Sequence, residues 1–151
     1  MTYLDTSALV KRFVSEEGSA LVQRLVWKDE PVASATIAYA ELYSGLARRH
    51  REGALSRVDY GRACRQFERD WLAVVKVELN ASVLGSARTL IERHGLRGFD
   101  AIHLASALGL QAAADEPITF VAADQRLLQA ATSERMATVN PERIAAGRGR
   151  P

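Results

Sequence analysis

The feature that most limits the fold of this chain is the alternation of short, largely apolar segments with longer segments of helical periodicity. The apolar segments, typical of buried strands, are residues 2–4, 31–33, 74–79, 118–122 and 137–139. The helical segments are residues 7–14, 18–28, a stretch that runs on to 51, then 56–71, 80–94, 99–113 and 125–131. Strands that are apolar throughout, rather than at every second position, belong to parallel sheets with both faces covered. The sequence therefore predicts an α/β fold with a central parallel β-sheet flanked by helices on both faces.

Several polar residues and one glycine predict where helices begin and end. Ser56 and Asn80 stand where N-caps are expected, and Gly95 is expected to end the helix that Asn80 begins. Ser34 or Thr36 is expected to cap the helix that runs on to residue 51.

Length and composition indicate one domain in a reducing compartment. The chain has 151 residues, and 48% of them are hydrophobic and 25% charged, which suits a single globular domain with its own core. No run of eighteen apolar residues predicts a membrane span, and Asp5 interrupts any secretory leader. The single cysteine, Cys64, cannot form an internal disulfide. We expect a cytoplasmic protein without membrane contact, with one domain over residues 1–140 and a flexible basic tail over 141–151.

The net charge of +2 hides an uneven distribution. Residues 48–70, here called the arginine strip, hold seven arginines against four acids. Within this strip we select Arg62, Arg65 and Arg69 as candidates for binding the phosphate backbone of RNA. The alternative is that the strip is a solvated helix face.

Four acids stand in positions unusual for surface charges. Asp5 directly follows the first predicted strand and Asp124 follows the fourth, and ligands of parallel sheets bind at these strand ends. Glu41 and Asp100 are isolated acids in otherwise apolar helices, where an unpaired carboxylate is costly. Four converging carboxylates repel one another unless a cation lies among them, and such hard oxygen ligands suit Mg²⁺ or Mn²⁺.

Each acid also has a structural alternative. Asp5 and Asp124 could act only as helix caps. Glu41 could pair with an arginine of the strip, and Asp100 could be a helix-start acid paired with Arg97.

Four sequence segments containing these acids resemble, in the same order, the motifs of PIN domains and in particular of VapC-type toxins. The segments are residues 4–9 (LDTSAL), 39–46 (YAELYSGL), 98–107 (GFDAIHLASA) and 120–128 (FVAADQRLL). The similarity extends from about residue 2 to residue 139. It implies a PIN-like fold and a Mg²⁺- or Mn²⁺-dependent endoribonuclease that acts on RNA as the toxin of a type II toxin–antitoxin pair. It also implies a homodimer and a VapB-like antitoxin partner.

The resemblance further assigns roles to individual residues. Asp5, Glu41, Asp100 and Asp124 would be the catalytic carboxylates. Asp5 and Asp100 would bind the metal, while Glu41 and Asp124 would reach it through water. Thr6 and Ser7 would support them by hydrogen bonds within the site.

Other interpretations stay open at this point. His103, three residues after Asp100, could be a general base, but a lone histidine in an apolar helix is more typical of a core residue. The chain could also be a housekeeping PIN-domain nuclease of RNA processing, or a weakly active PIN-like module that binds RNA or protein.

Overall fold

The computed structural model describes residues 1–26 and 30–143. Its centre is a five-stranded sheet in the order β3-β2-β1-β4-β5, with every neighbouring pair parallel. The strands are β1 (Thr2–Leu4), β2 (Val32–Ala35), β3 (Val75–Val77), β4 (Thr119–Val121) and β5 (Ala137–Val139). The predicted α/β fold with a central parallel sheet is therefore confirmed.

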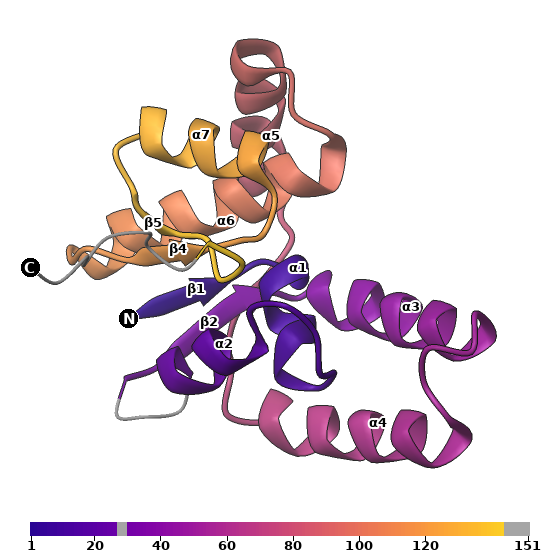
Figure 1. Ribbon diagram of the computed structural model, residues 1–151. Helices are drawn as coiled ribbons and strands as arrows, with labels where there is room; N and C mark the ends of the chain where they lie inside the picture. The colour runs from indigo at the N-terminus through magenta and orange to yellow at the C-terminus, as the bar shows by residue number, and fades with distance from the viewer. Residues whose placement is uncertain (27–29, 144–151) are drawn as a thin grey trace, which may run out of the picture.

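Helical segments cover both faces of this sheet (Figure 1). On one face lie α1 (Thr6–Leu9), the 3-10 turn η1 (Val10–Arg12), α2 (Ser19–Leu25), α3 (Ala38–Arg51) and α4 (Arg57–Trp71). On the other lie α5 (Ala81–His94), α6 (Gly98–Ala114) and α7 (Gln125–Ser133). In the part of the chain that the structure describes, none of the helices combines the length and apolar character that a membrane-spanning helix requires.

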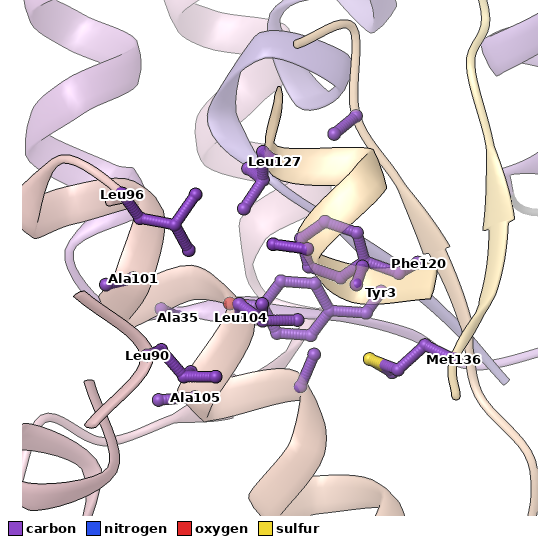
Figure 2. Packing of buried hydrophobic residues seen from close by; sticks show 14 of the residues in the cluster. Tyr3, Ala35, Leu90, Leu96, Ala101, Leu104, Ala105, Phe120, Leu127 and Met136 are labelled. Carbon is purple, nitrogen blue, oxygen red and sulfur yellow. The ribbon is translucent and has the colours of Figure 1, made fainter. Parts of the chain in front are cut away.

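Each face of the sheet has its own hydrophobic core, which explains strands that are apolar at successive positions. Tyr3 and Phe120 point toward α5, α6 and α7, where their rings stack with centroids 5.5 Å apart (Figure 2). Their neighbours Leu4 and Val121 point to the opposite face, where they pack with the residues of α1 to α4. Since successive side chains of a strand alternate between faces, only an apolar pair can fill both cores.

The predicted caps are confirmed on α4 and α5 but wrong on α3. Ser56 and Asn80 accept the backbone N–H groups of the third helical residue, and Gly95 ends α5 in the left-handed region at φ 64°. Helix α3, in contrast, has Ile37 at its N-cap. Ser34 lies inside β2, where its hydroxyl donates to the Leu4 carbonyl at 2.7 Å. The Thr36 hydroxyl is directed at the Val77 carbonyl at 3.4 Å.

Strand β1 lies in the middle of the sheet, with β2 paired on one side of it and β4 on the other. The chain runs from β1 outward to β2 and β3, and then crosses back to β4 and β5 on the opposite side. This arrangement opens a crevice at the carboxyl ends of β1 and β4, where parallel sheets bind their ligands. Of the predicted tail, residues 141–143 are described and residues 144–151 lie outside the described part of the chain.

Candidate active site

The four predicted acids lie around one cavity at the carboxyl ends of β1 and β4. The cavity has a volume of about 680 Å³, and we call it the acidic cavity. Asp5 follows β1, Asp124 follows β4, Glu41 is in the first turn of α3 and Asp100 is in the first turn of α6. All four line the acidic cavity, as do Thr6 and Ser7.

Asp5 is buried, and two donors hold its carboxylate. Its Oδ1 accepts hydrogen bonds from the Ala8 N–H at 3.0 Å and the Ser7 hydroxyl at 2.7 Å. Ser7 in turn accepts the N–H of Ala123 at 2.9 Å, which ties the end of β1 to the end of β4. Burial raises the pKa of Asp5 above its ordinary value, and repulsion from Asp100 adds to this, although His103, Ser7 and Ala8 oppose it. A buried carboxyl with a raised pKa gains strongly from a nearby cation.

Glu41 is bound by Thr6 and His103 rather than by an arginine of the strip. Thr6 Oγ1 donates to Glu41 Oε1 at 2.8 Å, and His103 Nε2 lies 2.7 Å from the same oxygen. Burial alone would raise the pKa of Glu41, but the hydrogen bond and charge of His103 outweigh it, so the pKa is lowered. Glu41 is thus held as a carboxylate at the cavity wall.

His103 is both a buried residue and a part of the site. It is only 2% exposed, and its Nδ1 lies 3.0 Å from the Tyr3 hydroxyl. A carboxylate only accepts hydrogen bonds, so Nε2 must carry the proton that Glu41 accepts. The Tyr3 hydroxyl donates to Nδ1 when the ring is neutral and accepts from it when the ring is charged. The prediction of a buried residue is confirmed, but His103 also fixes Glu41.

Asp100 and Asp124 share one arginine. Arg97 Nε lies 3.0 Å from Asp100 Oδ2, and Arg97 Nη2 lies 3.6 Å from Asp124 Oδ2. The Arg97 side chain is 79% exposed, so solvent screens both ion pairs. Asp124 also caps α7, because its Oδ1 accepts the N–H of Leu127 at 2.9 Å.

The donor set of the acidic cavity fits a divalent cation of the Mg²⁺ type. In residues 1–26 and 30–143, no three Asp, Glu, His or Cys side chains are arranged to hold a metal as they stand. The four carboxylates nevertheless supply the hard oxygen ligands that Mg²⁺ and Mn²⁺ prefer, and such ions keep several waters. Arg97 already places a positive group between two of them. These side chains therefore face a position where positive charge is stabilised.

The three arginines selected from the strip do not line the acidic cavity. Arg62, Arg65 and Arg69 belong to α4, and Arg62 is paired with Asp59 at 3.0 Å. The arginines at the acidic cavity are Arg48, Arg49 and Arg97. The sequence did contain a signal for Arg48, since it lies seven residues after Glu41 and so on the same face of α3.

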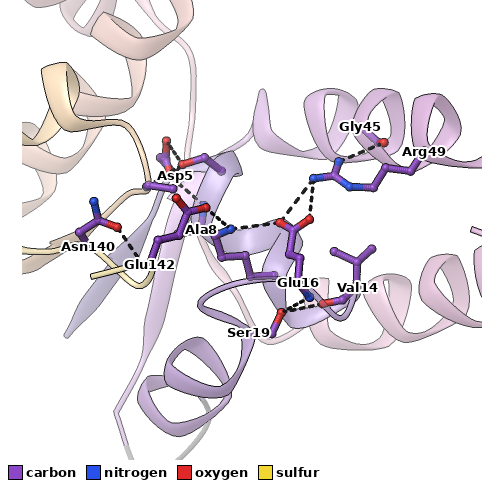
Figure 3. A network of polar contacts seen from close by, with 12 residues as sticks. Asp5, Ala8, Val14, Glu16, Ser19, Gly45, Arg49, Asn140 and Glu142 are labelled. Atoms are coloured by element: carbon purple, nitrogen blue, oxygen red, sulfur yellow. Dashed lines mark hydrogen bonds and ion pairs between the residues drawn. The ribbon is translucent and has the colours of Figure 1, made fainter. Parts of the chain in front are cut away.

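A polar network beside the acidic cavity connects four segments of the chain (Figure 3). The buried Lys11 donates to Glu16 at 3.1 Å and to Glu142 at 2.6 Å. Glu16 also pairs with Arg49 of α3 at 3.1 Å. Next to this network Gly18 has φ 85°, and a Cβ there would lie 2.8 Å from the Pro141 carbonyl oxygen. Residues 141 and 142 therefore contact the body of the domain.

Comparisons with known proteins agree with this site and fold. The PIN domain family matches residues 2–132. Ribonuclease VapC45 of Mycobacterium tuberculosis is 38% identical over 127 residues, which cover 84% of this chain and 86% of that protein. Ribonuclease VapC47 of the same species is 32% identical over 145 residues, covering 93% and 97%.

Solved structures of low sequence identity share the fold. A toxin–antitoxin complex from Klebsiella pneumoniae superposes with a TM-score of 0.66 at 15% identity, covering 95% of this chain and 100% of that one. VapBC2 from Rickettsia felis, bound to a DNA fragment from its promoter, superposes with a TM-score of 0.62 at 17% identity, covering 93% and 98%. With its four acids, its parallel sheet and these relatives, the chain belongs to the PIN domain family.

Proposed function

We propose that this chain is an endoribonuclease that depends on Mg²⁺ or Mn²⁺ and acts as the toxin of a type II toxin–antitoxin pair. The observation that carries the proposal is that four carboxylates from separate segments line one cavity at the carboxyl ends of the central strands. The relatives named ribonucleases support RNA as the substrate.

Some side chains of the cavity would bind the metal ion, and others orient the side chains that bind it. We assign Asp5 and Asp100 to direct contact with the ion, and Glu41 and Asp124 to contact through water. When bound, a divalent ion withdraws charge from the scissile phosphate and helps a water molecule to lose its proton. Thr6 and His103 orient Glu41, and Ser7 orients Asp5. Arg48 lies on the cavity wall within reach of the phosphates of a bound strand.

Cleavage should stop in EDTA and return when Mg²⁺ or Mn²⁺ is added, because the crowded carboxylates need a cation to act on a phosphate. The measurement is cleavage of total cellular RNA by the purified chain, followed by mapping of the new RNA ends. Undiminished cleavage in EDTA would contradict the metal mechanism, and mapped ends that are absent at every metal concentration would contradict the nuclease.

An antitoxin partner and a homodimer are further parts of this proposal. Solved relatives of the fold include toxin–antitoxin complexes, which supports a VapB-like antitoxin as the partner of this chain. Co-expression of a cognate VapB-like antitoxin should relieve the toxicity of the chain and abolish RNA cleavage. The homodimer and the cytoplasmic location stay predictions, and analytical ultracentrifugation of the purified chain tests the first of them.

A further inference from the structure

One aromatic side chain, that of Phe99, also lines the acidic cavity. Phe99 is the second residue of α6 and directly precedes Asp100. Its side chain is 58% exposed, although phenylalanine is a residue that folding usually buries. It lines the acidic cavity and also a smaller adjoining cavity of about 480 Å³, together with Glu41, Arg97 and Ile102.

Phe99 differs from the other exposed aromatic residue in the described part of the chain. Tyr39 is bonded through its hydroxyl to Glu68, and its ring packs against Tyr43, Phe67 and Trp71. The ring of Phe99 forms no aromatic pair within residues 1–26 and 30–143. An open aromatic face therefore remains at the edge of a site lined by carboxylates and arginines.

Helical geometry places Phe99 on the same side of α6 as His103, which contacts Glu41. Phe99 and His103 are four residues apart in α6, so they lie on the same side of the helix, one turn apart. His103 is buried against Glu41, whereas Phe99, one turn earlier in α6, is exposed. Arg48 and Arg97 line the same cavity.

Positive groups along a backbone path, with an exposed aromatic ring beside it, are the combination by which proteins bind single-stranded nucleic acid. We propose that Phe99 is a stacking platform for the nucleobase next to the scissile phosphate. The strand must then be unpaired at that nucleotide, because a base inside a duplex offers no free face. The inference rests on the ribonuclease function proposed above and adds a base-binding subsite to it.

The test compares RNA with and without bases. Fluorescein-labelled decamers of adenylate and of abasic ribose phosphate are titrated with the purified chain in EDTA, so that binding is measured without cleavage. Phe99→Ala should weaken binding of the adenylate decamer by about 5- to 150-fold, the range of one lost base stack. Binding of the abasic decamer, which offers only charge, should not change.

Matched variants separate stacking of a base from a general apolar contact and from damage to the fold. Phe99→Trp should restore adenylate binding, whereas Phe99→Leu, apolar but not aromatic, should not. Leu84→Ala is the control, since Leu84 is 49% exposed on α5 and does not line the cavity. A melting temperature within about 2 °C of the wild type shows that each variant is folded.

Three results would overturn the proposal. They are equal binding of both decamers by the wild type, an equal loss for both decamers in Phe99→Ala, and an effect of Phe99→Ala on antitoxin binding or dimerisation alone. The last result would make Phe99 a protein contact. If the wild type prefers the adenylate decamer through Phe99 but cuts no RNA when Mg²⁺ or Mn²⁺ is added, the subsite stands and the nuclease proposal fails.

Discussion

Asp5 and Asp124 each cap a helix and line the acidic cavity at the same time. From the sequence these two roles are alternatives, but a carboxylate has two oxygens and several acceptor sites. Asp124 uses Oδ1 for the N–H of Leu127 and presents Oδ2 to Arg97. Capping therefore fixes the direction in which the second oxygen points, and a cap signal does not argue against a catalytic role.

His103 is the site residue whose role the sequence could not establish. Its place in an apolar helix correctly predicts burial, and its spacing from Asp100 gives the correct helix. Its contact with Glu41, however, joins α6 to α3 across 62 residues of sequence. Only the packing of the two helices around the end of β1 brings these groups within 2.7 Å.

Asp100→Asn should abolish RNA cleavage without lowering the melting temperature of the metal-free protein. The substitution removes repulsion on Asp5, and the ion pair that it breaks with Arg97 is exposed and weak. We expect the cleavage rate to fall on the order of a hundredfold or more. Asp115→Asn makes the same chemical change at the other end of α6, outside the cavity, and should leave the rate unchanged. An Asp100→Asn protein that unfolds would make Asp100 a structural residue.

Arg97→Gln should strengthen binding of the metal ion. The guanidinium lies between Asp100 and Asp124 and competes with any cation for their oxygens. Losing two exposed ion pairs should improve the affinity for Mn²⁺ by about three- to tenfold. Isothermal titration calorimetry measures this without an activity assay. Arg88→Gln breaks an exposed pair with Glu92 on α5 and is the control; an equal affinity in wild type and Arg97→Gln would contradict the competition.

At the scale of elements, periodicity and capping residues correctly predicted those helix ends that depend only on interactions within one turn. Helix α5 begins after Asn80 and ends at Gly95, as expected, since both residues act within their own turn. The predicted N-cap of α3 was wrong because the hydroxyls of Ser34 and Thr36 form hydrogen bonds with neighbouring strands instead. A hydroxyl at a strand end can satisfy either partner, and only the position of β1 and β3 beside β2 decides between them.

Lys11→Met should lower the free energy of unfolding by about 2 kcal/mol at pH near 7, because two carboxylates lose charge-assisted hydrogen bonds. Burial alone would raise the pKa of Glu16, but its hydrogen bonds with Lys11 and Arg49 lower it below the ordinary 4.5. A depressed carboxyl pKa gives stability that is complete above 4.5 and is lost as the pH falls through the folded value. The cost of Lys11→Met should therefore shrink below pH 4.5.

Urea unfolding of both proteins over a series of pH values measures this difference. Lys76→Met is the matched control, since the Lys76 ammonium contacts the Trp71 ring and the Val74 carbonyl rather than a carboxylate. Its cost should not vary as Glu16 titrates. A cost of Lys11→Met that is constant from neutral to acid pH would show that Glu16 and Lys11 do not stabilise one another.

At the scale of the whole molecule, the sequence predicts layers but not the order of strands. Apolar strands between helices imply a parallel sheet covered on both faces, and the two cores confirm it. The order β3-β2-β1-β4-β5 depends on long-range pairing, which local patterns do not record. For the same reason the sequence showed the arginine strip as a whole but did not single out Arg48 and Arg49 as its members that line the acidic cavity.

The structure gives a path by which the strip could still contact RNA. A third cavity, of about 670 Å³, lies between η1 and α4 and is lined by Arg12 and Arg62, among other residues. It shares Glu16 and Arg49 with the acidic cavity, so the two are neighbours on one side of the molecule. A strand that leaves the acidic cavity over Arg49 would next meet Arg62.

Charge variants along this path should change the salt dependence of RNA binding by predictable amounts. For single-stranded RNA, each phosphate contact contributes about 0.7 to the slope of log affinity against log salt concentration. Arg48→Gln should therefore lower the slope by about 0.7, and a triple variant with Arg62, Arg65 and Arg69 changed to Gln by about 2, both without regard to base sequence. Arg88→Gln, on the opposite layer, should have no effect. If the triple variant keeps the wild-type slope while Arg48→Gln lowers it, bound RNA ends at the acidic cavity, and the exposed face of α4 is solvated or binds a protein partner.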